Sequence, residues 1–345
     1  ENYSELAGDL FDVFVNGISE GRNWDKEKTI DIINNGPYII TQNAIDAGLV
    51  TGTMYPDEFE DYIKDLNDEK NNITKWEDID RSDKYVHEWS PKENDKIAVI
   101  YAVGGIQSGK SNPGPTGSTI MGDKTIMKAI KSARENKDVK AIVLRIDSGG
   151  GSVLASDNMW REIYRTTTED TTNVKPFIAS MSDIAASGGY YIACEADSIL
   201  ADEATITGSI GVIGLRFNTS ELMKRIGINT ESITFGDNAD FATGSRLISD
   251  EHRARIQESI NETYTDFKQK VSDGRYNISE EDNLDDIALG RVFTGKQASD
   301  LDLFLVDKLG GIYDAIETAK NAAGIEGDVE IVEYPMNDTE FQFDI

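Results

Sequence analysis

The chain has 345 residues, of which 39% are hydrophobic, and its 63 acidic and 34 basic residues give a formal net charge of −29. This length and apolar content predict a globular protein with a buried core and room for more than one domain. The acidic balance disfavours nucleic acid and anionic lipid as partners, because both carry negative charge and bind basic surfaces. The single cysteine, Cys194, excludes an internal disulfide and a cysteine-based metal site, and we expect it to be a buried thiol.

Targeting signals are not evident in the sequence. No apolar run approaches the roughly 20 residues of a membrane-spanning helix. The chain opens with Glu1-Asn2-Tyr3, without Met and without a signal-peptide pattern. We therefore expect that the start of the gene product precedes this chain.

Helices are predicted for most of residues 1–66. Apolar side chains recur at helical spacing over 4–20, and further helices are expected over 26–34, 41–47 and 58–66. The fold class of this block alone is helical.

The order of elements in residues 1–66 returns later in the chain. A predicted helix over 258–271 ends in Gly274-Arg275, just as the first helix ends in Gly21-Arg22, and each is followed by a turn, a short helix and a Leu-Val pair. Two unrelated amphipathic helices would not be expected to share this order. We therefore interpret residues 1–66 as the tail of an earlier copy of a repeat, whose front is not in this chain.

The rest of the chain predicts an α/β domain. The polar residues 67–95 are expected to be a linker. Residues 96–324 alternate between strands and helices, which is typical of an α/β fold. The expected elements are a strand over 97–103, a helix over 122–135, a strand over 141–146 and a helix over 153–165, with alternation continuing to about residue 233. Residues 325–345 are expected to hold a late strand over 329–334 and an acidic tail.

A crowd of small residues around Ser187 is the first candidate site. An apolar segment ending at Ala179 leads into D-I-A-A-S-G-G-Y-Y-I, which predicts a strand, a tight turn and a helix that begins near Ser187. A hydroxyl at that position can face a cleft, and the free N–H groups of a helix start favour developing negative charge. The alternative is a helix-capping serine in a close-packed contact.

A second glycine cluster favours the catalytic interpretation. The predicted strand over 141–146 ends in R-I-D-S-G-G-G-S, where glycines let backbone N–H groups approach a ligand closely. Together with D-I-A-A-S-G-G-Y-Y-I and T-G-S-I-G-V-I, this motif resembles the signal peptide peptidase A (protease IV) family, serine peptidases of the Clp/crotonase superfamily. The resemblance covers about residues 97–324. It implies a Clp/crotonase-like domain of repeated β-β-α units, preceded by the helical tail of an upstream tandem copy.

The resemblance also implies roles for individual residues. Ser187 matches the nucleophile, and Gly150 and Gly188 match the positions whose backbone N–H groups hold the oxyanion. Ser209, in T-G-S-I-G, matches the serine that positions a lysine amine. Gly149 stands where the family usually has proline, and Asp147 where asparagine is common; neither change removes a reacting group.

The general base is expected to lie outside this chain. In the resembled family the base is a lysine, which can act when burial lowers its pKa from about 10.4 towards neutrality. The position that carries it in short family members is Ala239 here, and no lysine occurs between Lys224 and Lys268. Long members take the lysine from the first tandem copy, so we expect it upstream of Glu1.

Other motifs carry no site. Residues 104–111, G-G-I-Q-S-G-K-S, match a phosphate-binding loop, but the prolines and glycines that follow predict a loop rather than the helix such a site requires. The two histidines, His87 and His252, are expected to be solvated. No catalytic zinc motif is present, and neither a metal nor a cofactor is expected.

These features predict a membrane-associated serine peptidase that degrades cleaved signal peptides or other unfolded hydrophobic segments with a Ser/Lys dyad. The resemblance implies a homo-oligomer, a ring or bowl such as a tetramer, with the catalytic part on the extracytoplasmic side and membrane contact only through upstream sequence. Two alternatives stay open: an inactive scaffold or assembly subunit of the same fold, and, less favoured, an acyl-CoA enzyme of the crotonase type, because fold alone does not decide function.

Overall fold

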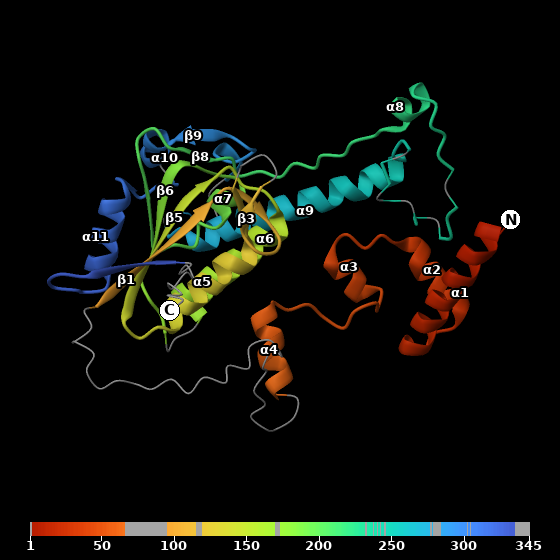
Figure 1. Ribbon diagram of the computed structural model, residues 1–345, viewed down its shortest axis with the longest axis horizontal. Helices are drawn as coiled ribbons and strands as arrows, with labels where there is room; N and C mark the ends of the chain where they lie inside the picture. The colour runs from red at the N-terminus through yellow and green to blue at the C-terminus, as the bar shows by residue number, and fades with distance from the viewer. Residues whose placement is uncertain are drawn as a thin grey trace, which may run out of the picture. The chain divides into compact units, whose positions relative to one another are not determined.

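The computed structural model describes residues 2–65, 95–114, 119–169 and 173–334, apart from 232, 237, 240, 242, 245, 277, 279–283, 302 and 304. Contacts divide the chain into two compact units (Figure 1). The first unit comprises residues 1–63 and 213–263, and the second comprises residues 64–212 and 264–345. The division into a helical tail, a linker, a peptidase domain and an acidic tail stays a prediction.

The second unit is built on a parallel sheet in the order β10-β7-β6-β5-β1-β11. The strands are β1 (Lys96–Val103), β5 (Val139–Ser148), β6 (Phe177–Ala186), β7 (Ser198–Ala201), β10 (Lys308–Leu309) and β11 (Glu330–Tyr334). The middle strands are mostly buried apolar runs, as expected for a parallel sheet that is covered on both faces. The α/β class predicted from the sequence is confirmed.

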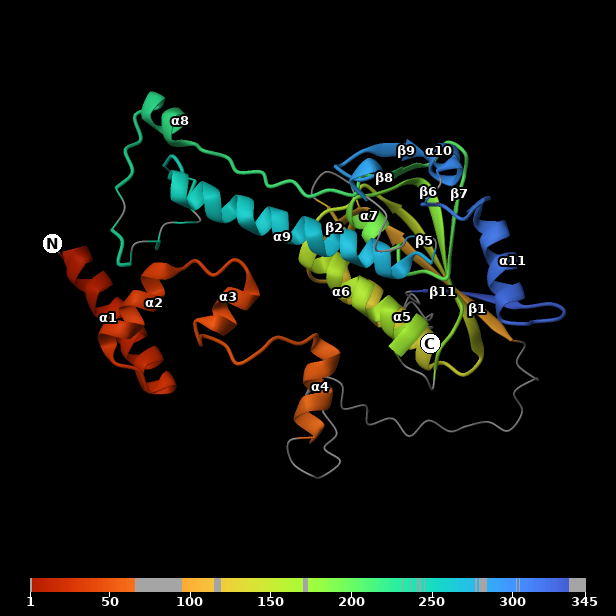
Figure 2. The ribbon, with the colours of Figure 1, turned by 180° about the vertical axis from the view of Figure 1, so that it is seen from behind.

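Helices cover the two faces of this sheet (Figures 1 and 2). On one side α11 (Ile312–Ala322) packs Ala315 and Ala319 against Ile97, Val143 and other alternate side chains of the strands. On the other side lie α5 (Asp123–Glu135) and α6 (Val153–Tyr164), each with an apolar stripe at helical spacing. The core therefore lies in two layers, one on each face of the sheet.

Shorter strands form a second layer beside the carboxyl ends of the main strands. β2 (Gly105–Gln107), β4 (Thr119–Gly122) and β3 (Asn112–Pro113) make a small mixed sheet. β8 (Ile206–Gly208) pairs with the last residues of β6 and with β9 (Val292–Thr294), which leads into α10 (Gly295–Asp300). β6 thus changes partners along its length, from β7 at Ile178–Met181 to β8 at Ile184–Ala186.

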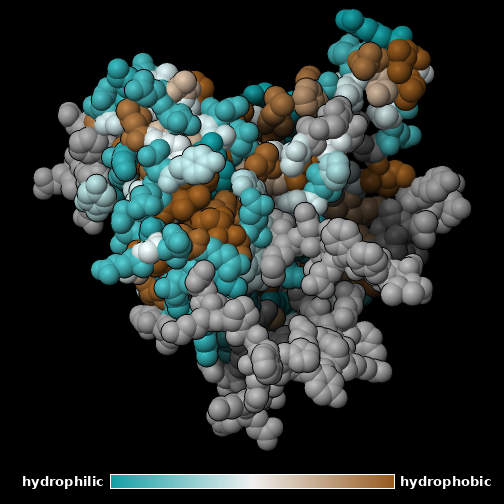
Figure 3. Space-filling view, turned by 60° about the vertical axis from the view of Figure 1, so that its left-hand side comes forward, coloured by the Kyte–Doolittle hydropathy of each residue, from teal (hydrophilic) through white to brown (hydrophobic). Residues whose placement is uncertain are grey.

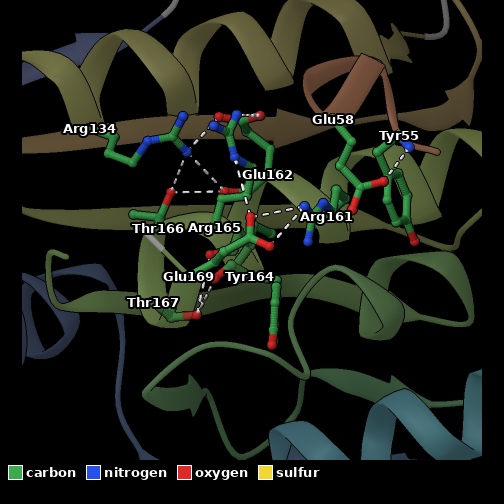
Figure 4. Close-up of polar contacts among 11 residues, drawn as sticks. Tyr55, Glu58, Arg134, Arg161, Glu162, Tyr164, Arg165, Thr166, Thr167 and Glu169 are labelled. Carbon is green, nitrogen blue, oxygen red and sulfur yellow. Dashed lines mark hydrogen bonds and ion pairs between the residues drawn. The ribbon is translucent and has the colours of Figure 1, made fainter. Parts of the chain in front are cut away.

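A buried ion pair joins α5 to the carboxyl end of α6 (Figure 4). Arg134 Nη1 lies 2.6 Å from Glu162 Oε1 and donates to Thr166 Oγ1 at 3.2 Å. Thr166 belongs to the π-helical turn that follows α6, η2 (Arg165–Glu169), in which Glu169 lies 2.9 Å from Arg161. This cluster fixes the last turn of α6 on α5.

The first unit is helical, as its sequence predicts. It contains α1 (Asn2–Arg22), α2 (Lys26–Asn35), α3 (Thr41–Asp46), α8 (Ser220–Arg225), most of α4 (Pro56–Asp65) and the first half of α9 (Asp250–Gly274). Phe11 of α1 stacks on Phe235 at a centroid distance of 5.8 Å, and Asn238 donates to Asn34 O of α2 at 2.5 Å. The unit therefore joins the start of the chain to residues 213–263.

One prediction of secondary structure is wrong, and another is confirmed. The alternation of strands and helices stops at β8 instead of continuing to residue 233, because residues 211–219 find no strand to pair with among the described residues. Their apolar side chains are left exposed, and Ile213 is 95% exposed; exposed apolar groups appear as brown atoms in Figure 3. The helix predicted to begin near Ser187 is confirmed as α7 (Gly188–Tyr191), which is four residues long, and the chain then turns towards β7.

Candidate active site

Ser187 lies at the turn between β6 and α7. Its backbone has φ 52° and ψ −119°, a conformation that costs energy for a residue with a side chain. The turn is held on both sides: the N–H of Ser187 donates to Gly208 O at 3.0 Å, and its carbonyl accepts from the N–H of Tyr191 at 2.9 Å. A strained strand-to-helix turn is the geometry in which many hydrolases expose a nucleophilic serine, and the hydroxyl-bearing residue here is half-buried.

The glycine loop after β5 lies directly against this turn. A Cβ built on Gly150 would be 2.7 Å from the N atom of Gly188 and 3.0 Å from Cβ of Ser187. Gly150 also has φ +97°, which disfavours any other residue. The two glycine clusters that the sequence predicts to form one site are therefore brought together by the fold.

The Gly150 N–H already has a partner in the structure. The resemblance implies that this group holds the oxyanion, and here it donates to Ser148 Oγ at 3.1 Å. Ser148 is buried and donates in turn to Gly104 O at 2.7 Å. Gly188, as the first residue of α7, has an N–H that its own helix cannot use. The N–H of Gly188 is thus the donor that is available beside Ser187. The second predicted donor, the N–H of Gly150, is bonded to Ser148 Oγ.

Ser209 follows a strand that pairs with the strand of Ser187. Gly208 is the register partner of Ala186, so Ser187 and Ser209 are the next residues on two neighbouring strands. Ser209 has φ 50° and donates its N–H to Arg291 O at 2.6 Å. Four predicted site residues, Ser187, Gly150, Gly188 and Ser209, therefore lie at one end of the sheet.

The position expected to carry a lysine in short family members is occupied by Ala239. Ala239 lies in the first unit, where its N–H donates to Gly236 O. The nearby His252 is buried, with Nε2 2.5 Å from Asn238 Oδ1 and its ring edge-on to Phe241. The prediction that His252 is solvated is therefore wrong, because Asn238 and Phe241 provide a partner and a cover. His87 lies outside the described residues.

One lysine has a strongly lowered pKa, but it is bound elsewhere. Burial, aided by the charges of Lys140 and Arg134, lowers the pKa of Lys175 to about 8. Its Nζ donates to Ala133 O at 2.9 Å and to Asn136 O at 2.5 Å. Lys175 precedes β6, whereas Ser187 follows its other end. This amine is therefore not placed to activate Ser187.

A polar cluster beneath α7 was not predicted. The hydroxyl of Tyr191 lies 2.9 Å from Asp157 Oδ1 of α6 and 3.1 Å from Asp266 Oδ2 of α9. Lys270 Nζ lies 3.2 Å from the same Asp157 oxygen and 3.5 Å from the centroid of the Trp160 ring. No local signal in the sequence marks this cluster, because the adjacent Tyr190 carries the same hydroxyl and the partners of Tyr191 lie 34 and 75 residues away.

The phosphate-loop pattern at residues 104–111 forms no phosphate site. Its N–H groups bind side chains: Gly109 donates to Asp123 Oδ1 at 2.7 Å and Ser111 to Thr125 Oγ1 at 2.8 Å. Residues 112–113 form a strand rather than a helix start, as the prolines predict. No helix begins at residues 112–113, as predicted; residues 115–117 of the predicted loop lie outside the described residues.

The described residues hold neither a metal-binding cluster nor a membrane-spanning helix. They contain no group of three or more His, Cys, Asp or Glu side chains placed to hold a metal ion. None of their helices combines the length and apolar character needed to cross a bilayer. Cys194 is a buried thiol, as predicted, and its Sγ donates to Tyr191 O at 3.2 Å.

The known proteins to which this chain is similar are named as proteases. The model of peptidase family S49 matches residues 169–326. The chloroplastic serine protease SPPA of Arabidopsis thaliana is 38% identical over 335 residues, which cover 94% of this chain and 47% of that protein. Protease 4 of Salmonella typhi is 37% identical, covering 67% of this chain and 35% of its own length. A putative protease of Synechocystis, slr0021, is 37% identical over 68% of this chain and 76% of its own length.

The chain spans about half or less of the length of the first two of these relatives. Among solved structures, a membrane-bound stomatin-specific protease is similar with a TM-score of 0.38 at 15% identity, covering 70% of this chain and 97% of that one. ClpP1 of Listeria monocytogenes has a TM-score of 0.37 at 12% identity, covering 64% of this chain and 94% of its own.

Proposed function

Since the chain belongs to peptidase family S49, the family of signal peptide peptidase A and protease 4, we propose that it is a serine peptidase whose nucleophile is Ser187. One observation carries this proposal: the strained turn of Ser187 lies against the glycine loop, with 3.0 Å between the Ser187 Cβ and a Cβ built on Gly150. A Cβ at this position would meet the backbone of the Ser187 turn, so glycine is what lets the two loops pack directly against each other.

The reaction follows from this geometry. The Ser187 hydroxyl loses its proton to a base and attacks the carbonyl carbon of the scissile peptide, which forms a tetrahedral oxyanion. The Gly188 N–H stabilises the oxyanion, and the Gly150 N–H joins it when it turns from Ser148 to the stronger, charged acceptor. Collapse expels the amine and leaves an acyl-enzyme on Ser187, which water hydrolyses.

The base in this proposal is a lysine supplied by sequence upstream of Glu1, as in long family members. Ala239 has no titratable group, and Lys175 is bound to backbone carbonyls at the opposite end of β6. Ser209 lies next to Ser187 across the strand pair, where its hydroxyl can orient an incoming amine.

The substrates in this proposal are cleaved signal peptides or other unfolded hydrophobic segments. They fit a site of small residues that admits an extended backbone. The family resemblance adds a homo-oligomeric ring or bowl, such as a tetramer, membrane association through upstream sequence, and an extracytoplasmic catalytic part. A catalytically inactive scaffold of the same fold is the second candidate, favoured by the substitution of Ala239 for the short-form lysine.

A serine-reactive probe tests the proposal directly. The full-length protein is treated with a fluorophosphonate and digested, and we expect mass spectrometry to place the adduct on Ser187. Casein hydrolysis is then measured for the full-length protein and for the 345-residue chain, and we expect activity only in the former. Labelling and hydrolysis by neither protein would favour the scaffold, and equal activity of both would place the base within this chain.

A further inference from the structure

A polar cluster of four side chains lies beneath α7. Three helices meet there (Figure 2): α6, α7 and the second half of α9, from Tyr264 to Gly274. Tyr191 contributes the donor hydroxyl, Asp157 and Asp266 contribute carboxylates, and Lys270 contributes an ammonium group. The group lies one helical turn behind Ser187, whose carbonyl accepts the N–H of Tyr191.

The Tyr191–Asp157 contact connects the two halves of the candidate site. Tyr191 is on the helix that begins at Ser187, and Asp157 is on the helix that begins directly after the Gly149–Gly151 loop. The start of α6 is itself fixed, because the Ser152 N–H donates to Ile106 O at 2.9 Å. A 2.9 Å bond between Tyr191 and Asp157 therefore sets how far the nucleophile turn lies from the oxyanion loop.

The second half of α9 holds this bond in place. The Phe267 ring lies 4.7 Å from the Tyr191 ring, and Lys270 lies 3.2 Å from Asp157 and over the Trp160 ring of α6. Lys270 is 9% exposed, so its ammonium balances Asp157 in a largely dry environment. Burial and the charges of Asp157 and Asp266 raise the pKa of Tyr191, which keeps its hydroxyl protonated and able to donate.

We propose that Tyr191, Asp157 and Lys270 form a positioning cluster that fixes the spacing between Ser187 and the Gly150 loop and so sets the rate of acyl-enzyme formation. Displacing a reacting group by about 1 Å can reduce a rate on the order of 100-fold. The cluster touches neither substrate nor reacting atoms, so its effect falls on turnover rather than on substrate affinity. The inference rests on the proposed function, because it assumes that Ser187 reacts.

Two neighbouring tyrosines provide the test and its control. Tyr191→Phe removes the hydroxyl and keeps the ring on Phe267. Tyr190→Phe removes an equally buried hydroxyl, which donates to Leu305 O at 3.1 Å on the other side of the turn. In the full-length protein we expect Tyr191→Phe to lower kcat, and the rate of fluorophosphonate labelling of Ser187, by about 10-fold or more with KM within twofold. Tyr190→Phe should leave kcat and labelling within about twofold even where it lowers the melting temperature as much.

A double-mutant cycle checks that the two side chains act through one bond. Asp157→Ala removes the acceptor of the Tyr191 hydroxyl. We expect the Tyr191→Phe/Asp157→Ala protein to have a kcat no lower than that of Asp157→Ala alone, since the contact between the two side chains is already lost. Independent effects that multiply in the double variant would overturn the shared role.

The outcomes separate this inference from the proposed function. Ser187→Ala is assayed beside the tyrosine variants. Activity retained by Ser187→Ala would remove the proposed function itself. Loss of activity in Ser187→Ala with wild-type kcat in Tyr191→Phe, or an equal loss of kcat in Tyr190→Phe, would overturn the positioning cluster and leave the nucleophile in place.

Discussion

Each end of α6 carries an ionic cluster. One cluster connects α6 to α5, and the other connects α6 to α7. At the carboxyl end, Arg134 and Glu162 are almost completely buried and join one helix to another. Near the amino end, Asp157 is 23% exposed and joins α6 to the turn that carries Ser187. The same kind of interaction thus joins two helices of the core at one end of α6 and, near the other end, joins α6 to the turn of the proposed nucleophile.

The largest effect on activity is expected from removing the hydroxyl of Ser187, the proposed nucleophile. Ser187→Ala should abolish peptidase activity, with a loss on the order of 1,000-fold or more. Folding should be unchanged, because alanine has the same backbone strain at φ 52° and only a half-buried hydroxyl is lost. Casein hydrolysis and thermal unfolding are measured beside Ser132→Ala, a serine on α5. Normal turnover by well-folded Ser187→Ala would contradict the assignment.

A substitution at the carboxyl end of α6 should lower the free energy of unfolding and leave kcat unchanged. Glu162→Gln leaves the buried guanidinium of Arg134 without its carboxylate, which costs about 3–5 kcal/mol of folding free energy. Urea unfolding should show this loss, while kcat below the unfolding transition stays at the wild-type value. A fall in kcat comparable to that expected for Tyr191→Phe would erase the distinction between the two ends.

A substitution in the glycine loop is expected to lower kcat by less than the loss of the Ser187 hydroxyl does. Gly150→Ala introduces a Cβ within 2.7 Å of the Gly188 N atom at φ +97°, so the loop must shift away from Ser187. We expect kcat to fall by about 100-fold with a smaller change in KM. Gly149→Ala is the matched control, since its Cβ would meet only Ile184 Cδ1 at 3.5 Å. Equal losses in both variants would point to a general disturbance of the loop.

The smallest expected effect is a pH-dependent change in the free energy of unfolding, which arises from Glu195 near the amino-end cluster. Burial raises the pKa of Glu195 to about 7 from 4.5, although a bond from Trp160 opposes the shift. The folded state therefore holds a proton that the unfolded state releases, and stability falls as pH rises from 4.5 to 7. Glu195→Gln should raise the free energy of unfolding by about 1–2 kcal/mol at pH 8, allowing for partial exposure. The gain should vanish at pH 4, as urea titrations at both pH values can show; an equal gain at pH 4 would assign it to packing.

Much of the catalytic half could be predicted from the sequence because its signals are local. Buried apolar runs bounded by glycines identify β5 and β6, and the small residues around Ser187 and Gly150 reflect close backbone approach that only glycine permits. Parallel strands bring their carboxyl ends to one edge, so the meeting of these loops follows from the alternating pattern.

The remaining features depend on contacts between distant parts of the chain. Tyr191 is separated from Asp157 by 34 residues and from Asp266 by 75, so nothing near it marks its hydroxyl as bonded. His252 was expected in water because its own helix start is polar, yet Asn238 and Phe241 cover it. The exposed apolar residues 213–217 read as a strand, but strand formation requires a pairing partner that a local pattern does not reveal.

The continuous strand β6 has a consequence for how the protein would lose activity. Its first residues are core sheet between β5 and β7, and its last residue is followed directly by Ser187, whose amide is itself bonded to Gly208. Ser187, the proposed nucleophile, is therefore not on a loop that can open alone: its amide should exchange with deuterium as slowly as those of Ile178 and Ala179. On heating, the reactivity of Ser187 and the integrity of the sheet should disappear in the same transition, so thermal inactivation of this site measures unfolding of the whole sheet.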